Sequence, residues 1–155
     1  MKIALRLSCV SLACLALAAC GGSGTGNRQQ IMNLFNGMYT AFAQGNYAQV
    51  CTDMSLRQQD NIVSGARKAG LNVSSCTDAF TTLLKQAGIS KEQVAKAFGA
   101  SGIQRKLDSV SIHGNQATVT FTETEKAQTS TETDGLVREG GQWRADRVLK
   151  RTQSG

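Results

Sequence analysis

The chain has 155 residues and a formal net charge of +6 at pH 7. It contains no proline, one histidine and five cysteines, and charged residues make up 18% of it. This length fits a single domain with one hydrophobic core. The charge is too small for a typical nucleic-acid-binding protein, so no nucleic-acid partner is expected. The few histidines and cysteines exclude a zinc finger and a disulfide-dense mini-protein.

The first 19 residues have the parts of an export signal. Lys2 and Arg6 form a short basic region, and residues 7–16 are an apolar run too short to span a bilayer as a permanent helix. The sequence Leu-Ala-Ala-Cys follows at residues 17–20. It resembles the lipobox of bacterial lipoproteins, in which the cysteine is lipidated and becomes the new amino terminus. An ordinary secretory signal that happens to contain a cysteine is the alternative.

The lipobox resemblance implies a membrane-anchored mature protein. Residues 1–19 would be removed and Cys20 would carry the lipid, which leaves 136 residues with a charge of +4 because two basic residues are lost. Membrane lipid is then a partner, and the protein is expected on the extracytoplasmic side of the cell membrane, with the outer membrane as the alternative in a Gram-negative host. Residues 20–27 contain four glycines and are expected to form a flexible tether.

Counting cysteines leaves one pair for the mature domain. Cys9 and Cys14 leave with the signal and Cys20 takes the lipid, so Cys51 and Cys76 remain. An even pair in an oxidising compartment favours a disulfide, and two buried free thiols are the alternative. Two cysteines and a lone histidine do not supply four tetrahedral ligands, so no metal site is expected.

The first part of the mature chain has helical periodicity. Between residues 30 and 44, apolar side chains recur at spacings of three and four, which predicts an amphipathic helix. Its inward residues are expected to be Ile31, Leu34, Phe35, Met38, Tyr39 and Phe42. Weaker patterns predict four further helices, at residues 47–54, 56–69, 76–87 and 90–98.

After residue 102 the period changes from helical to alternating, which predicts strands. They are expected at residues 110–112, 117–122, 129–137 and 143–149. Because short turns join them, they should form an antiparallel meander of about four strands. Helices followed by such a sheet indicate an α+β fold. The single domain is expected to cover residues 28–150, with a tail at 151–155.

Two segments resemble the SnoaL-like branch of the nuclear-transport-factor-2-like superfamily. They are the Gln-Gly-Asn-Tyr step at residues 44–47 and the hairpin at residues 136–148. The resemblance covers residues 28–150 and implies a cone, in which a curved sheet wraps around the first helix and leaves an apolar pocket. The pocket-lining candidates are Phe35, Tyr39, Phe42, Phe121 and Trp143. The helical stretch at residues 71–102 is expected to cover part of the cone's mouth.

No catalytic residue and no cofactor are predicted. Enzymes of this fold use a pocket aspartate or histidine, but His113 lies in a predicted turn and Asp146 fits a surface pair on the last strand. Tyr39 is the only expected inward residue that can donate a proton, and a phenol with a pKa of about 10 is a poor base at neutral pH. Three further acids are interpreted as solvated or capping residues: Asp53, Asp60 and Asp78.

Three functions are compatible with these predictions. The favoured one is a non-catalytic lipoprotein that binds a small apolar ligand or an envelope protein. The others are an isomerase-type or cyclase-type enzyme of the same cone fold and a structural lipoprotein with a filled core. An open apolar pocket would favour the binder, a buried pocket aspartate the enzyme, and a filled cone the structural role. The oligomeric state is not predicted.

Overall fold

The computed structural model describes residues 24–99, 104–125 and 128–154. The expected signal peptide, Cys20 and the start of the tether lie outside the described residues. Five helices precede four strands in the described chain, which confirms the predicted α+β fold class. The helices are α1 (Gly24–Ala43), α2 (Tyr47–Thr52), α3 (Leu56–Lys68), α4 (Cys76–Gln86) and α5 (Lys91–Gly99). The strands are β1 (Gln104–His113), β2 (Gln116–Glu125), β3 (Gln128–Glu139) and β4 (Gln142–Ser154).

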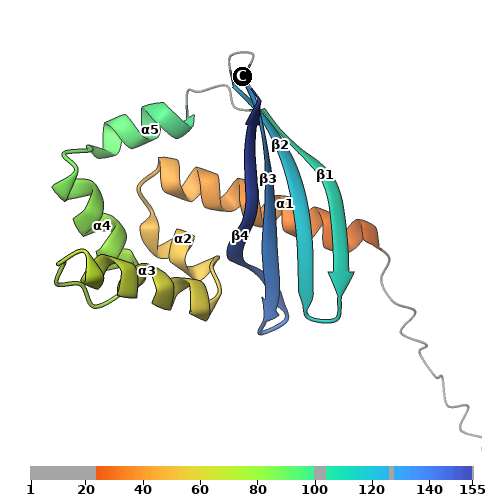
Figure 1. Cartoon of the computed structure of the whole chain (residues 1–155), viewed down its shortest axis with the longest axis horizontal. Coiled ribbons are helices and arrows are strands. Elements are labelled where there is room, and N and C mark those ends of the chain that lie inside the picture. The colour runs from red at the N-terminus through yellow and green to blue at the C-terminus, as the bar shows by residue number, and fades with distance from the viewer. Residues whose placement is uncertain (1–23, 100–103, 126–127, 155) are drawn as a thin grey trace, which may run out of the picture.

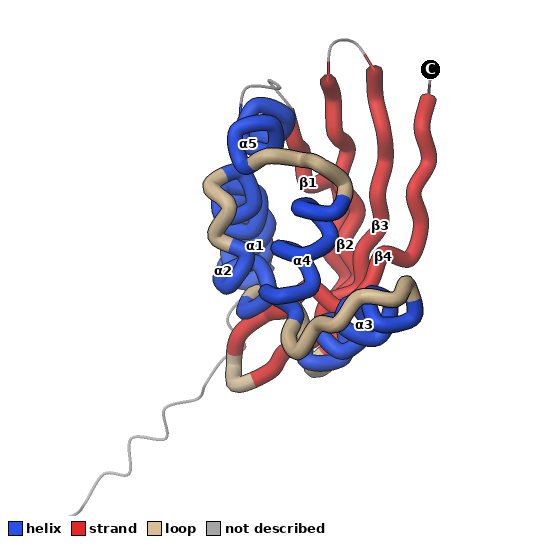
Figure 2. Tube along the Cα trace, turned by 90° about the vertical axis from the view of Figure 1, so that its left-hand side faces the viewer, coloured by secondary structure: helices blue, strands red, loops and turns tan. Residues whose placement is uncertain are grey.

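The four strands form one antiparallel sheet in the order β1-β2-β3-β4, which is the predicted meander. Helix α1 lies along one face of this sheet. Helices α2 to α5 lie around the C-terminal end of α1 (Figure 1). In the turned view, α1, α2, α4 and α5 lie to the left of β3 and β4, and α3 lies below β4 (Figure 2). We call the face of the sheet that packs on α1 the inner face.

The main hydrophobic core lies between α1 and the inner face. On β2, Ala117, Val119 and Phe121 are buried and alternate with threonines, as predicted for a strand with one buried face. From α1, Ile31 and Phe35 pack against them, and the Phe35 and Phe121 rings meet edge to face at 4.5 Å between centroids. The main core is therefore built on the middle of α1.

The β3–β4 pair contains two irregularities. Its register shifts between Thr133 and Asp134 and again between Gly135 and Leu136. Such bulges bend a strand and increase its twist. The sheet is therefore bent opposite the second half of α1.

The predicted disulfide between Cys51 and Cys76 is present. Cys51 lies in α2 and Cys76 is the first residue of α4, and both are buried. A second, smaller hydrophobic cluster holds α3 against α4 and contains Ala66, Leu71, Val73 and Ala79. The disulfide joins this helical layer to α2, which follows directly after α1.

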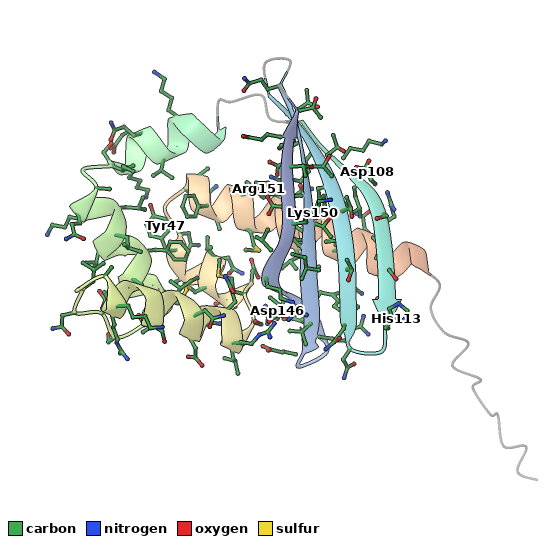
Figure 3. All side chains as sticks on the ribbon, viewed as in Figure 1. Tyr47, Asp108, His113, Asp146, Lys150 and Arg151 are labelled. Atoms are coloured by element: carbon green, nitrogen blue, oxygen red, sulfur yellow. A yellow bond between two sulfur atoms is a disulfide. The ribbon has the colours of Figure 1, made fainter. Side chains whose placement is uncertain are left out.

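The α2–α3 connection is attached to the edge of β4. The Ser55 amide donates to the Ala145 carbonyl at 2.8 Å, and the Ala145 amide donates to the Asp53 carbonyl at 2.9 Å. The Ser55 hydroxyl caps α3 and donates to Asp146 at 2.7 Å, and Arg57 forms an ion pair with the same carboxylate. The predicted surface position of Asp146 is therefore wrong: the residue is buried where α3 meets β4 (Figure 3).

Two boundaries differ from those expected. Strand β4 continues to Ser154, because β3 begins at Gln128 and its first residues pair with the last residues of β4, so residues 151–154 belong to the sheet and not to a tail. Helix α1 begins at Gly24, within the expected tether. The Asn27 side-chain oxygen accepts hydrogen bonds from Arg138 and Trp143, so this part of the tether is folded onto the domain.

Removal of the disulfide should lower the stability of the domain. The bond joins residues 25 positions apart, so it restricts the unfolded chain. The double variant Cys51→Ala/Cys76→Ala should lose about 2–5 kcal/mol of unfolding free energy in a denaturant titration. Mass mapping of the wild-type protein under non-reducing conditions should show the same cross-link. Two freely alkylatable thiols in the folded, oxidised protein would contradict this assignment.

Candidate functional site

A cavity of about 290 Å³ lies between the second half of α1 and the bent part of β3 and β4. Most of its wall is apolar or aromatic. The residues of this kind are Phe35, Met38, Tyr39, Phe42, Val50, Met54, Phe80, Ala145 and Val148. Val148 lines the cavity although it is 58% exposed, so the cavity opens to solvent beside β4.

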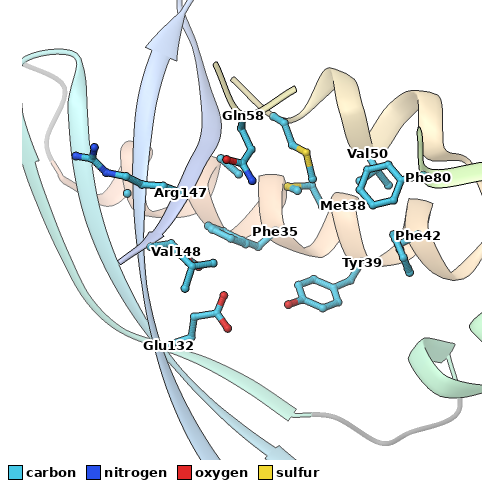
Figure 4. Close-up of a pocket in the computed structure, with 14 residues that line it drawn as sticks. Phe35, Met38, Tyr39, Phe42, Val50, Gln58, Phe80, Glu132, Arg147 and Val148 are labelled. Atoms are coloured by element: carbon cyan, nitrogen blue, oxygen red, sulfur yellow. The ribbon is translucent and has the colours of Figure 1, made fainter. Parts of the chain in front are cut away.

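The wall away from the sheet is an aromatic cluster. Phe42 packs edge to face against Tyr47 and Phe80, at 5.5 and 5.7 Å between ring centroids. Tyr47 and Phe80 stack on each other at 5.9 Å. Because Phe80 belongs to α4, the helical layer forms one side of the cavity (Figure 4).

Three of the five pocket candidates meet at this cavity. Phe35, Tyr39 and Phe42 line it. Phe121 instead is buried in the main core against Phe35. Trp143 belongs to the same core, and its edge contributes to a second, more polar hollow of about 580 Å³ on another side of the domain. The two sheet aromatics are used in core packing, so only the three candidates on α1 line the apolar pocket.

Two carboxyl groups that the sequence analysis did not assign to the pocket also line it. Glu132 and Asp134 are only 8% and 7% exposed, and both lie on the inner face of β3. They pair with Phe121 and Val119 of β2, which are core residues. The alternation of β2, combined with the hairpin register, could have revealed this placement. The inference that Tyr39 is the only titratable inward residue is therefore wrong.

Glu132 is neutralised by Arg151, with which it forms an ion pair. Next to this pair, Arg105 forms an ion pair with Glu123, and its guanidinium lies 3.3 Å above the centre of the Tyr39 ring. The Tyr39 hydroxyl donates to Glu123 at 3.3 Å. Burial, reinforced by nearby carboxylates and opposed by Arg105, raises the pKa of Tyr39 to about 12.

Asp134 has no such cationic partner. None of the ion pairs formed by the described residues involves it. Burial, together with the charge of Glu132 and a hydrogen bond to it, raises the pKa of Asp134 to about 7, and Arg151 opposes this only in part. Asp134 therefore holds its proton at acidic pH and hydrogen-bonds to the neighbouring Glu132 carboxylate. We call these two residues the carboxyl pair.

The other polar residues considered from the sequence lie outside the apolar cavity. His113 is exposed at the end of β1, with its Nε2 atom 3.1 Å from the Ser111 hydroxyl (Figure 3). Asp53 forms an ion pair with Arg144 at 3.6 Å, and Asp78 accepts a hydrogen bond from the Ser74 amide at 2.8 Å. Asp60 is exposed on α3.

Neither a metal centre nor a membrane-spanning helix is found in the part of the chain that the structure describes. No group of three or more His, Cys, Asp or Glu side chains within those residues is arranged to hold a metal ion. None of the described helices combines the length and hydropathy needed to cross a bilayer.

Comparison with known proteins gives distant structural likenesses only. No family model matches the chain, and no curated protein matches it. A nuclear-transport-factor-2-like protein of unknown function from Shewanella baltica has a TM-score of 0.49 and 10% identity, over 86% of this chain and 98% of that chain. Another such protein, from Silicibacter pomeroyi, has a TM-score of 0.47 and 14% identity, over 81% and 98%. These structures are described as having unknown function, so they provide no activity to transfer.

Replacing Asp134 should change how stability depends on pH. Since its pKa is raised from 3.8 to about 7, the unfolded chain releases this proton at a lower pH than the folded one. The wild-type domain should therefore lose stability as pH rises through this interval. One pKa unit corresponds to about 1.4 kcal/mol. We expect Asp134→Asn to remove about 2 kcal/mol of this loss.

Urea unfolding at a series of pH values measures this effect. Asp60→Asn is the matched control, because it makes the same chemical change at an exposed aspartate outside the cavity. The control should retain the wild-type pH dependence, whereas Asp134→Asn should show a flatter one. Identical pH dependence in wild type and Asp134→Asn would show that Asp134 titrates normally.

Proposed function

We propose that the chain is an exported lipoprotein, anchored through Cys20, whose domain is a cone of the nuclear-transport-factor-2-like type and binds a small, mostly apolar ligand without transforming it. The observation that carries the binding proposal is the cavity, whose wall is mainly apolar and aromatic and which opens to solvent at Val148. Pockets of this kind suit small organic ligands. The open cavity also disfavours a purely structural role with a filled cone.

The element order supports the cone assignment. A long first helix lies along one face of the antiparallel meander (Figure 1). The cavity is lined by residues of this helix and of β3 and β4. This arrangement agrees with the SnoaL-like resemblance of residues 44–47 and 136–148.

The cavity lies away from the end of α1 that follows Cys20 in the sequence. The helix starts at Gly24, shortly after Cys20, whereas its cavity-lining residues run from Phe35 to Phe42. At 1.5 Å per residue, this places the cavity about 16–27 Å along the helix from its first turn. A ligand could therefore enter at a distance from the lipid attachment point.

An acid–base enzyme of the same fold is the second candidate. The observation in its favour is Asp134, a buried pocket carboxyl whose pKa is raised to about 7 by burial and by Glu132. Isomerisation next to a carbonyl also needs a hydrogen-bond donor for the developing oxyanion. The Tyr39 hydroxyl already donates to Glu123 and has a pKa raised to about 12 by burial. The pocket thus offers a base without a matched acid, which favours binding over catalysis.

The anchor is tested by Cys20→Ala. Without the thiol the protein cannot receive a thioether-linked lipid, so it should remain an unprocessed precursor or leave the membrane fraction. Mass spectrometry of the mature amino terminus and membrane fractionation measure both outcomes. Cys14→Ala, inside the expected signal, is the matched control and should leave lipidation unchanged. Normal cleavage and membrane retention of Cys20→Ala would contradict the lipoprotein assignment.

Ligand binding is tested with the neutral dye Nile red. Val148→Trp places a bulky side chain at the exposed mouth of the cavity and should weaken dye binding at least about fivefold, because it narrows the entrance. Leu149→Trp is the matched control: its position is the next one on β4, 46% exposed, and does not line the cavity. Equal weakening by both variants, or no saturable binding to the folded wild type, would contradict the proposal.

A further inference from the structure

We infer that the ligand of the cavity is a small amphiphile with a protonated amine, whose ammonium group binds the carboxyl pair while its apolar part lies along α1. This inference rests on the proposed ligand-binding function and specifies the chemistry of the ligand. It follows from how the charges are distributed at one end of an otherwise apolar cavity.

The charges around the polar end of the cavity do not balance. The inward acids are Glu123 on β2 and the carboxyl pair on β3, and the inward bases paired with them are Arg105 on β1 and Arg151 on β4. Each arginine is already engaged with one glutamate. With Asp134 ionised, three carboxylates among the described residues therefore face two guanidiniums, and one negative charge is left at the cavity wall.

Arg147 does not remove this excess charge. Its side chain lies against Gly135, where Cγ and Nε occupy the space beside the glycine. In the close-up its guanidinium points away from Tyr39 and Glu132 (Figure 4). Arg147 therefore lines the mouth through the base of its side chain, and its charge is held outside the cavity.

The carboxyl pair is placed to receive a cation from the cavity. Glu132 points from the strand toward the open space in front of Tyr39 (Figure 4). Glu132 and Asp134 are two positions apart on one strand, so they project from the same face. An ammonium group has three donors and no acceptor, so it can bind two neighbouring carboxylates at once.

Other ligand classes fit less well. An anionic amphiphile would place a second negative charge beside the unbalanced carboxylate in a largely buried site, which is unfavourable. A neutral alcohol could donate one hydrogen bond but would leave the charge in place. A quaternary ammonium would lack the donors. A protonated amine neutralises the charge and satisfies the oxygens, and a cavity of about 290 Å³ limits it to a small molecule.

The test compares three ligands with the same apolar chain: octylamine, octanol and octanoate, each below its micelle concentration. Each is titrated against Nile red bound to the folded mature domain near pH 8. At this pH the amine is still a cation and the octanoate an anion. We expect octylamine to displace the dye at a concentration about tenfold lower than octanol, and octanoate to be the weakest. A tenfold difference corresponds to about 1.4 kcal/mol.

Two variants test whether the advantage of octylamine over octanol depends on the carboxyl pair. Asp134→Asn should remove the advantage of octylamine over octanol while leaving octanol within about twofold of wild type, a difference well below 1.4 kcal/mol. Asp60→Asn, the exposed control, should keep the full advantage. Circular dichroism checks that both variants are folded, and the ligand series on the wild-type domain gives an answer even if Asp134→Asn is not.

The possible results distinguish a failure of the amine assignment from a failure of the proposed ligand-binding function. Octanol as strong as octylamine, or octanoate as the strongest competitor, would overturn the amine assignment and leave the apolar pocket standing. An amine advantage that survives Asp134→Asn in a folded variant would also overturn it. Failure of Nile red and of all three competitors to bind the folded wild type would overturn both.

Discussion

The structure depends on the packing of α1 against a sheet that it covers only in part. Ile31 and Phe35 fill the space against Val119 and Phe121, and this contact forms the main core. Beyond Phe35 the sheet bends at the two bulges beside Asp134 and Gly135. The same α1 face that builds the core therefore continues past it and becomes one wall of a cavity, and Phe35 contributes to both.

This partial coverage explains how acids come to line an apolar pocket. The inner face of β3 carries Leu136 in the core and the carboxyl pair further along the strand. Arg151 compensates Glu132, but only because β4 continues to the end of the described chain and pairs with the start of β3. Within the described residues, no ion pair is formed by Asp134. Its burial costs stability, which is consistent with a site kept for a ligand.

The periodicity of the sequence was sufficient to predict the types of the elements, but it predicted only part of the candidate site. The apolar stripe of α1 and the alternation of β2 predicted the helix, the strand and the three α1 residues that line the cavity. Glu132 and Asp134 were missed because a strand rich in threonine and acidic residues is expected to be exposed to solvent. Only its register with Val119 and Phe121 shows that these two side chains face inward. Asp146 was misplaced because no local pattern reveals that Ser55 and Arg57, about ninety residues earlier, approach it.

The most direct test of this account is an NMR titration of the side-chain carboxyl of Asp134 in the free domain and with octylamine. A midpoint near pH 7 is expected in the free protein, because burial and Glu132 raise the pKa of Asp134 to about 7. Octylamine should lower that midpoint, since an ammonium beside the carboxyl favours its charged form, and octanol should not. An ordinary carboxyl midpoint near pH 4 that octylamine leaves unchanged would contradict the account.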